Sequence, residues 1–356
     1  ARLALDPEGP LPDYVRAGED DCMRLGLWAP LPHTIRPEPE IDLALEELGT
    51  HGLGLPLDRS FRFVLETVQR AEELGFDITL VAERLVARDL EAWVVSSALA
   101  VLTQRIQIMT AVHPGIIHPQ MVAKMGASVD RISGGRFAVN VIPGRRPHEF
   151  DLFGNGSWLQ DTAQRYRRME EFIDAITGLW TQESYDLDGA FFKIADGELA
   201  TRPMSQPRPP IFAASSAEQG KDIIARTCDT WFISHAPGLQ AYEANVASIG
   251  ADIIDMRRRA MQHGRSLGYG LSTYVICAPT AELAQAEAAG LDRTPEANVA
   301  AKALGAGLVG TPQIIADRIR RYEDLGVDCL MLQFHPMQKG LETFAQEVMP
   351  LIRSRD

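Results

Sequence analysis

The chain has 356 residues, of which 46% are hydrophobic and 23% are charged, which is enough apolar content to build a large core. Its formal net charge of −13 argues against nucleic acid or a membrane surface as a partner, because both need a basic surface. No apolar run approaches the roughly 18 residues of a membrane span, and the N-terminal stretch lacks the apolar core of a signal peptide. We therefore expect a cytoplasmic protein.

Short apolar runs alternate along the chain with segments of helical period. The predicted strands are, in order, residues 23–29, 78–82, 106–112, 136–142, 210–215, 230–234, 271–278 and 327–334. The predicted helices are residues 61–77, 90–104, 120–133, 161–180, 216–227, 238–264, 311–326 and 340–352. Such alternation indicates a parallel sheet. Eight units over about 330 residues favour a closed (β/α)₈ TIM barrel.

An open, doubly wound sheet is the alternative α/β arrangement. It would call for a glycine-rich turn after the first strand, and the sequence that follows that strand, APLPHTIRPEPE, contains no glycine. We expect one barrel domain over residues 22–356, preceded by an N-terminal arm over residues 1–21. Long loops at 30–60 and 143–160 follow strands and are natural active-site walls, whereas 181–209 is expected to form a small outer hairpin.

The four cysteines are Cys22, Cys228, Cys277 and Cys329. None belongs to a CxxC pair, so we expect neither a metal site nor a disulfide framework. Cys277 and Cys329 lie in apolar runs and are predicted core residues.

Two pairs of polar residues suggest an anion site. Ser215 and Ser216 lie where the fifth strand turns into a helix, and hydroxyls beside the N–H groups of a helix N-terminus suit a phosphate; a plain helix cap is the alternative. Arg165 and Tyr166 begin the helix after strand four and could complete a phosphate clamp, or could instead belong to a solvated helix face.

Three residues are candidates for chemistry at the barrel mouth, the carboxyl-terminal ends of the strands. Asn140 lies inside the apolar strand RFAVNVI, where an amide must find a partner or face the mouth. His113 and His335 end strands three and eight. Each histidine is either an acid–base group or a hydrogen-bonded loop residue.

Four segments carry a resemblance to a known family: HPQMVAKMGASVDRISGGRFAVNVIPGRRPHEF, RYRRMEEFIDAITGLWTQESYDLDGAFFKI, PIFAASSAEQGKDIIARTCDTWFIS and LVGTPQIIADRIRRYEDLGVDCLML. In this order they resemble the core motifs of the bacterial-luciferase-like, flavin-dependent monooxygenases. Within that family the chain is similar to the group of alkanesulfonate, dimethylsulfone and pyrimidine monooxygenases. The resemblance covers residues 22–353.

The resemblance implies a two-component enzyme. A separate NAD(P)H:flavin reductase would supply reduced FMN (FMNH₂), O₂ would add to give a flavin-peroxide, and a small organosulfur or heterocyclic compound would be oxygenated. It also implies a homo-oligomer, dimer or tetramer. Carried over by position, the flavin contacts would be Ala82, Glu83, Asn140, Glu149, Arg165, Tyr166, Ser215 and Ser216. From their places at the strand ends, and not from the resemblance, His113 and His335 are the candidate catalytic residues beside Asn140.

The chain also departs from those relatives. Ala111 stands where pyrimidine oxygenase has a threonine, and Ser272 and Tyr274 stand where alkanesulfonate monooxygenase has an arginine and a histidine. Without that arginine a free sulfonate is disfavoured as the substrate, because a buried anion needs a cationic partner to offset its desolvation. Residues that could substitute are Lys302, Arg145, Arg146 and His113. Two other functions stay open on the same barrel: a deazaflavin-dependent dehydrogenase, and a flavin-binding protein without catalysis.

Overall fold

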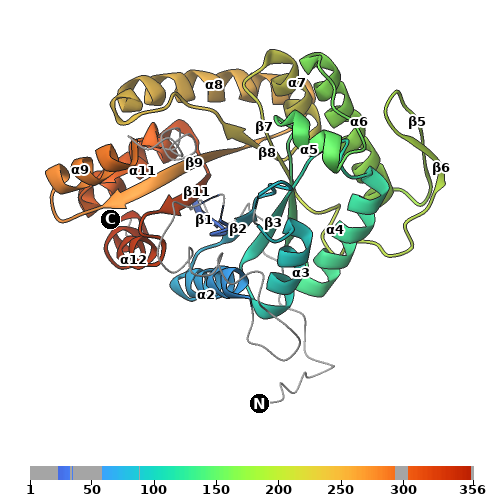
Figure 1. Cartoon of the computed structure of the whole chain (residues 1–356). Coiled ribbons are helices and arrows are strands. Elements are labelled where there is room, and N and C mark those ends of the chain that lie inside the picture. The colour runs from blue at the N-terminus through green and yellow to red at the C-terminus, as the bar shows by residue number, and fades with distance from the viewer. Residues whose placement is uncertain (1–22, 33, 35–57, 88, 293–303, 354–356) are drawn as a thin grey trace.

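The structure is a computed structural model that describes residues 23–32, 34, 58–87, 89–292 and 304–353 (Figure 1). The predicted N-terminal arm, Cys22, most of the 30–60 loop and Lys302 lie outside the described residues.

Eight parallel strands close into a barrel. In order around the ring they are β1 (Arg24–Trp28), β2 (Ile78–Val81), β3 (Gln107–Val112), β4 (Phe137–Val141), β7 (Ile211–Ala214), β8 (Thr230–Ile233), β9 (Gly268–Cys277) and β11 (Cys329–Phe334). β11 pairs with β1 and closes the ring, with Leu25 beside Leu330. The predicted TIM barrel is therefore confirmed.

Helices form the outer layer of the barrel in Figure 1. They are α2 (Arg59–Leu74), α3 (Ala92–Leu102), α4 (Pro119–Ser133), α6 (Thr162–Thr181), α7 (Glu218–Thr227), α8 (Tyr242–Gln262), α11 (Pro312–Leu325), α12 (Met337–Thr343), a π-helical turn (Phe344–Val348) and α13 (Met349–Arg353). Local sequence sets their ends. The Asp58 side chain accepts a hydrogen bond from the N–H of Phe61 at the start of α2, and Gly75 ends that helix with a φ of 89°, a conformation that glycine adopts without strain.

Three elements were not predicted: α5 (Pro147–Leu152), α9 (Ala281–Asp292) and β10 (Val309–Gly310). α5 and β10 are too short to show a periodic pattern. The expected outer hairpin is present as β5 (Tyr185–Asp188) and β6 (Lys193–Gly197), which project beyond α4 and α6 (Figure 1).

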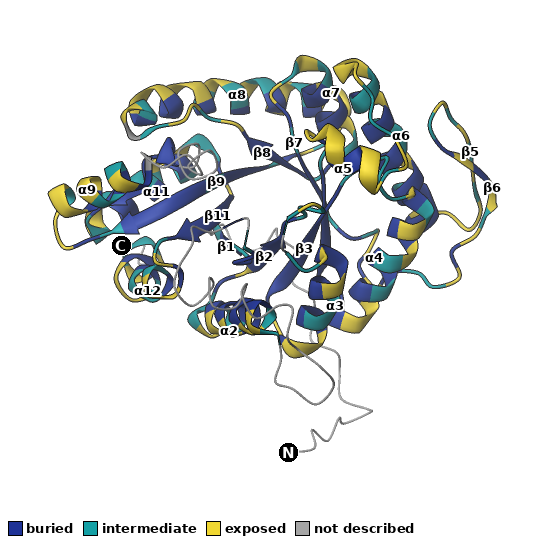
Figure 2. Ribbon diagram, in the orientation of Figure 1, coloured by how far each residue is buried: buried dark blue, intermediate teal, exposed yellow. Residues whose placement is uncertain are grey.

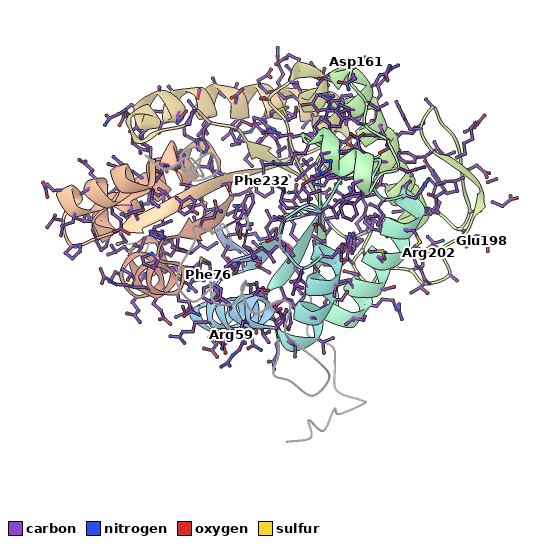
Figure 3. The ribbon with its side chains drawn as sticks, in the orientation of Figure 1. Arg59, Phe76, Asp161, Glu198, Arg202 and Phe232 are labelled. Carbon is purple, nitrogen blue, oxygen red and sulfur yellow. The ribbon has the colours of Figure 1, made fainter. Side chains whose placement is uncertain are left out.

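The core has two layers, drawn dark blue in Figure 2. One lies between the strands and the helices, and the other fills the barrel. The barrel interior consists of Ile78, Leu80, Met109, Ala111, Ala138, Phe212, Phe232, Cys329 and Met331. Phe232, labelled in Figure 3, stacks on Phe212 with ring centroids 5.6 Å apart.

The cysteine predictions hold in part. Cys329 is buried in the barrel interior as expected, whereas Cys277 is only half-buried. Among the described helices, none is long and apolar enough to cross a membrane.

Candidate active site

Ser215 and Tyr166 meet at the end of β7. The two hydroxyl oxygens lie 2.8 Å apart, and both residues are buried, with 4% and 9% of their surface exposed. The Ser215 hydroxyl also accepts a hydrogen bond from the N–H of Ala217 at 3.1 Å. The structure therefore brings together two of the residues predicted to hold a phosphate, from α6 and from the loop before α7.

The N-terminus of α7 adjoins this pair. The helix is capped at Ala217 with no side-chain hydrogen bond, so neither serine acts as its cap, and Ser216 is exposed. A Cβ atom at Gly220 would lie 2.1 Å from the Ser215 hydroxyl oxygen and 2.5 Å from Cε1 of Tyr166. Only glycine lets the first turn of α7 come this close, and a helix N-terminus of this kind favours an anion.

Arg165 contacts the loop that precedes α6. Its guanidinium donates to the carbonyl oxygens of Leu159 and Gln160, at 2.6 and 3.0 Å, and to the hydroxyl of Thr162. It also lies over the Trp158 ring at 4.6 Å. Arg165 thus holds the end of the 143–160 loop, and no described contact joins it to Ser215.

Asn140 on β4 points into the barrel, because its register neighbours Ala111 and Phe212 both belong to the interior. Its side chain is 5% exposed. Its Oδ1 atom is buried and accepts no hydrogen bond from the described residues. A buried amide oxygen without a donor costs free energy, so this atom is a candidate acceptor for a bound group.

Carboxylates line the end of β2. Ala82 is buried there, and Glu83 accepts a hydrogen bond from the N–H of Ala92 at 3.1 Å. Burial raises the pKa of Glu83 to about 7. Glu149, on α5, is buried and forms an ion pair with Arg84 at 3.0 Å, so that pair adds little net charge to the site.

His113, at the end of β3, lies beside these groups. Its Nδ1 is 3.3 Å from the carbonyl oxygen of Ile142. Its ring packs edge-on against the Phe150 ring, with the ring centroids 6.4 Å apart. Burial lowers the pKa of His113, which favours a neutral imidazole near pH 7. His335 follows β11 and is half-buried.

The structure adds three residues that sequence reasoning missed or gave no role. Trp28, at the end of β1, donates from its indole Nε1 to the Ser272 hydroxyl at 2.8 Å. His235, in the loop after β8, places Nε2 3.0 Å from the carbonyl oxygen of Ser272. The place of Trp28 at the end of a strand could have marked it as a mouth residue. Its contact with Ser272 could not be predicted, because 244 positions separate the two residues in the sequence.

Other predicted residues lie apart from this group. Arg145 and Arg146 are exposed before α5, and Tyr274 is buried among residues that include Ala284 and Ala288 of α9. Within the described ranges, no three His, Cys, Asp or Glu side chains converge as a metal site.

The sequence profile of the luciferase-like monooxygenase family matches residues 23–329. The chain belongs to this family. Its catalytic class is therefore that of a monooxygenase.

Two luciferase-like relatives are FMNH₂-dependent dimethylsulfone monooxygenases. The one from Pseudomonas putida is 32% identical over 322 residues, covering 80% of this chain and 86% of the relative. The one from Pseudomonas fluorescens (strain Pf0-1) is 31% identical, with 80% and 85% covered. Among solved structures, EDTA monooxygenase from Chelativorans sp. BNC1 superposes with a TM-score of 0.72 at 19% identity, covering 94% of each chain, and it supports the fold alone.

A phosphorylated flavin fits the described residues of this luciferase-like barrel. The Ser215–Tyr166 pair and the start of α7 offer hydrogen bonds where an anion is favoured,. The unpartnered Asn140 oxygen inside the barrel offers an acceptor to a ring N–H group,.

Proposed function

We propose that this chain is the oxygenating component of a two-component monooxygenase. It would take FMNH₂ from a separate flavin reductase in the cytoplasm and oxygenate a small organosulfur or heterocyclic compound. The observation that carries the proposal is the buried, unpartnered Oδ1 of Asn140 at the barrel mouth. An atom of this kind is retained where a bound molecule supplies the missing donor.

Each end of the flavin would have its own residues. Ser215, Tyr166 and the N-terminus of α7 would bind the phosphate. Asn140 would accept a hydrogen bond from the reduced ring, and Ala82, Glu83 and Glu149 would line its surroundings. When bound, reduced FMN supplies the activation of O₂ and the transfer of one oxygen atom. The protein orients the two reactants and keeps water out.

The two histidines would serve as hydrogen-bonding or proton-transfer groups. His113 has a lowered pKa and would be neutral near pH 7, so its imidazole can accept a proton or share one. Its edge contact with Phe150 fixes the ring. His335 would act from the end of β11, which lies three strands from β3 around the ring.

The substrate is proposed to be uncharged. Trp28 and Ser272 face the barrel interior through their register neighbours Leu80 and Met331. The Ser272 hydroxyl accepts a hydrogen bond from the Trp28 indole. Its own O–H group can therefore donate to another acceptor, such as a sulfonyl or carbonyl oxygen. Arg84 is paired with Glu149, and Arg145 and Arg146 are exposed to solvent, so none of these three described cations is a buried partner for a sulfonate.

We further propose a homo-oligomer formed through α3 and α4. Val94, Val101 and Leu102 are exposed on α3, and Met121 and Ile132 are exposed on α4. The neighbouring α2 instead carries the surface ion pairs of Arg62 with Glu66 and of Arg70 with Glu73. Apolar faces of this kind usually pack against a partner.

The partner is proposed to be a second copy. Exposed Glu91 and Arg105 lie just beyond the two ends of α3. A two-fold axis across the helix would set Glu91 of one copy near Arg105 of the other.

The experiment is an anaerobic titration of the protein with FMNH₂, followed by a pulse of O₂ and a panel of substrates. We expect FMNH₂ to bind and one uncharged organosulfur or heterocyclic compound to be oxygenated. Tight binding of a deazaflavin without FMNH₂ binding would support the dehydrogenase instead. Binding of FMNH₂ with no product from any substrate and no release of hydrogen peroxide would support a flavin-binding protein.

A further inference from the structure

Arg168 on α6 is a buried cation with few partners. It is 4% exposed, and its Nη1 donates to the carbonyl oxygen of Ser157 at 2.6 Å. Its Nε and Nη2 atoms are buried and make no hydrogen bond with the described residues. The ion pairs formed within the described ranges include none for Arg168. Burying a charge in this way is costly.

Three segments meet at this guanidinium. Its Cζ lies over the Phe150 ring at 5.3 Å, which brings in the 143–160 loop. A Cβ atom at Gly115 would lie 2.4 Å from Cζ, so the loop after β3 packs directly on the guanidinium. The Ser157 hydroxyl donates to the carbonyl oxygen of Gly115 at 2.6 Å and ties the two loops together.

Arg165, one turn earlier on α6, makes the same kind of contact. It lies over Trp158 and donates to the carbonyl oxygens of Leu159 and Gln160. The Trp158 and Phe150 rings pack edge-on with their centroids 5.3 Å apart. Two guanidinium groups and two rings therefore form one cluster. We name it the arginine clasp (Arg165, Arg168, Phe150 and Trp158). Burial and the charge of Arg165 lower the pKa of Arg168 to about 10.

Packing alone does not account for this arrangement. An apolar side chain of similar length would fill the same space without the desolvation cost of a cation. The guanidinium instead lies over the Phe150 ring and donates a hydrogen bond to the loop backbone. The hydrogen bond constrains direction as well as distance.

We propose that Arg168 is a positioning residue that holds the 143–160 loop in its place beside the barrel mouth. It acts through Phe150, whose ring touches His113, and through the neighbouring Glu149, which pairs with Arg84. That these residues border the flavin rests on the proposed function. The clasp itself is a property of the flavin-free protein.

The test compares Arg168→Met with Arg167→Met, a neighbour on the same helix whose side chain is exposed. Amide hydrogen exchange is measured on the full, flavin-free chain. In Arg168→Met we expect the amides of 147–158 to exchange at least about tenfold faster, equivalent to about 1.4 kcal/mol. Exchange in the barrel strands, and throughout Arg167→Met, should match the wild type.

A second readout is the imidazole signal of His113 by NMR. Glu149 and Arg84 are the charged groups that act on this ring, and the backbone of Glu83 is hydrogen-bonded to it. If the loop loosens, water reaches the ring and its pKa rises toward the ordinary value of about 6.5. If Arg168→Met does not fold, Arg168→Lys, which keeps the charge but loses the planar guanidinium that lies over Phe150, decides the matter with the same two measurements.

Unchanged exchange over 147–158 together with an unchanged His113 titration would overturn the proposal. So would equal acceleration in Arg167→Met. Because neither measurement uses flavin, failure of the clasp is distinguishable from failure of the proposed function, which the FMNH₂ titration tests separately.

Discussion

Tyr166 and Ser215 hydrogen-bond to each other at 2.8 Å, although they come from α6 and from the loop after β7. The contact orients both hydroxyls before any ligand arrives, so little ordering is left to be done on binding. Gly220 makes the contact possible by leaving room for both side chains.

If this pair binds the flavin phosphate, removing either hydroxyl should weaken FMN binding. We expect Ser215→Ala and Tyr166→Phe each to cost about 1–3 kcal/mol, the range for hydrogen bonds to charged groups. Riboflavin, which lacks the phosphate, should bind equally well to variants and wild type in calorimetry. Thr181→Ala, which removes an exposed hydroxyl at the far end of α6, is the control. Equal losses for FMN and riboflavin would show that the pair does not touch the phosphate.

Asn140→Ala should keep the fold and lose most product formation, with hydrogen peroxide released in place of product. The reason is that the amide oxygen has no donor within the described protein and would orient the ring. Product formed per FMNH₂ consumed is the measurement, with circular dichroism as the fold check. A milder loss is expected for His113→Ala. If Asn140→Ala forms as much product per FMNH₂ consumed as the wild type, Asn140 is a core amide with no role in oxygenation.

The proposed substrate charge can be tested with a matched pair. Dimethylsulfone and methanesulfonate are similar in size but differ by one negative charge. We expect oxygenation of the neutral compound only, and a roughly tenfold rise in its KM in Ser272→Ala, equivalent to about 1.4 kcal/mol for one lost hydrogen bond. Preference for methanesulfonate would contradict an uncharged site. It would also point to Arg145, Arg146 or a residue outside the described ranges as the cationic partner.

Glu83 should make stability depend on pH. Its folded pKa of about 7 lies above the ordinary value of about 4.3, so folding favours the protonated form. The free energy of unfolding therefore falls as pH rises between those two values. Glu83→Gln cannot ionise, and we expect it to be more stable than the wild type by about 1–2 kcal/mol at pH of about 8, after allowance for partial exposure.

The comparison is urea unfolding of the flavin-free protein at pH of about 5 and of about 8. At the lower pH the stability difference between the variant and the wild type should be smaller, because the wild-type carboxyl is then protonated in the folded state. An equal difference at both values would mean that the Glu83 carboxyl does not titrate near neutral pH.

The oligomer prediction uses two exposed apolar residues on different faces. Val101 is 68% exposed on α3 and Ile254 is 70% exposed on α8. A buried charge at an interface is costly, so Val101→Glu should shift the protein toward the monomer in light scattering after size-exclusion chromatography. Ile254→Glu should leave the mass unchanged. A wild-type monomer at micromolar concentration would refute the α3–α4 interface.

Much of the barrel could be predicted because each strand is short, apolar and followed by an amphipathic helix. α9 was missed for a physical reason. Its sequence is rich in alanine, and its buried positions include only Ala284, Ala288 and Leu291, so the contrast between its faces is low. β9 begins at Gly268, three residues earlier than predicted, since glycines weaken a strand pattern.

The site was less predictable than the fold. Ser215 and Tyr166 could be paired from their places at strand and helix ends, but nothing in the local pattern of Arg165 shows whether its side chain turns toward Ser215 or toward Trp158. The structure has it over Trp158. The Trp28–Ser272 contact joins the first and seventh strands of the barrel, and sequence periodicity carries no information about such a pair.

The pairing of β11 with β1 has a consequence for biosynthesis. Asn140, Tyr166 and Ser215 all lie between residues 137 and 215, so the proposed cofactor residues leave the ribosome in the first two thirds of the chain. The ring closes only when the strand Cys329–Phe334 is available to join Arg24–Trp28 and β9. The Trp28–Ser272 contact spans that seam, so the proposed substrate side of the mouth forms only after the proposed cofactor residues have been synthesised.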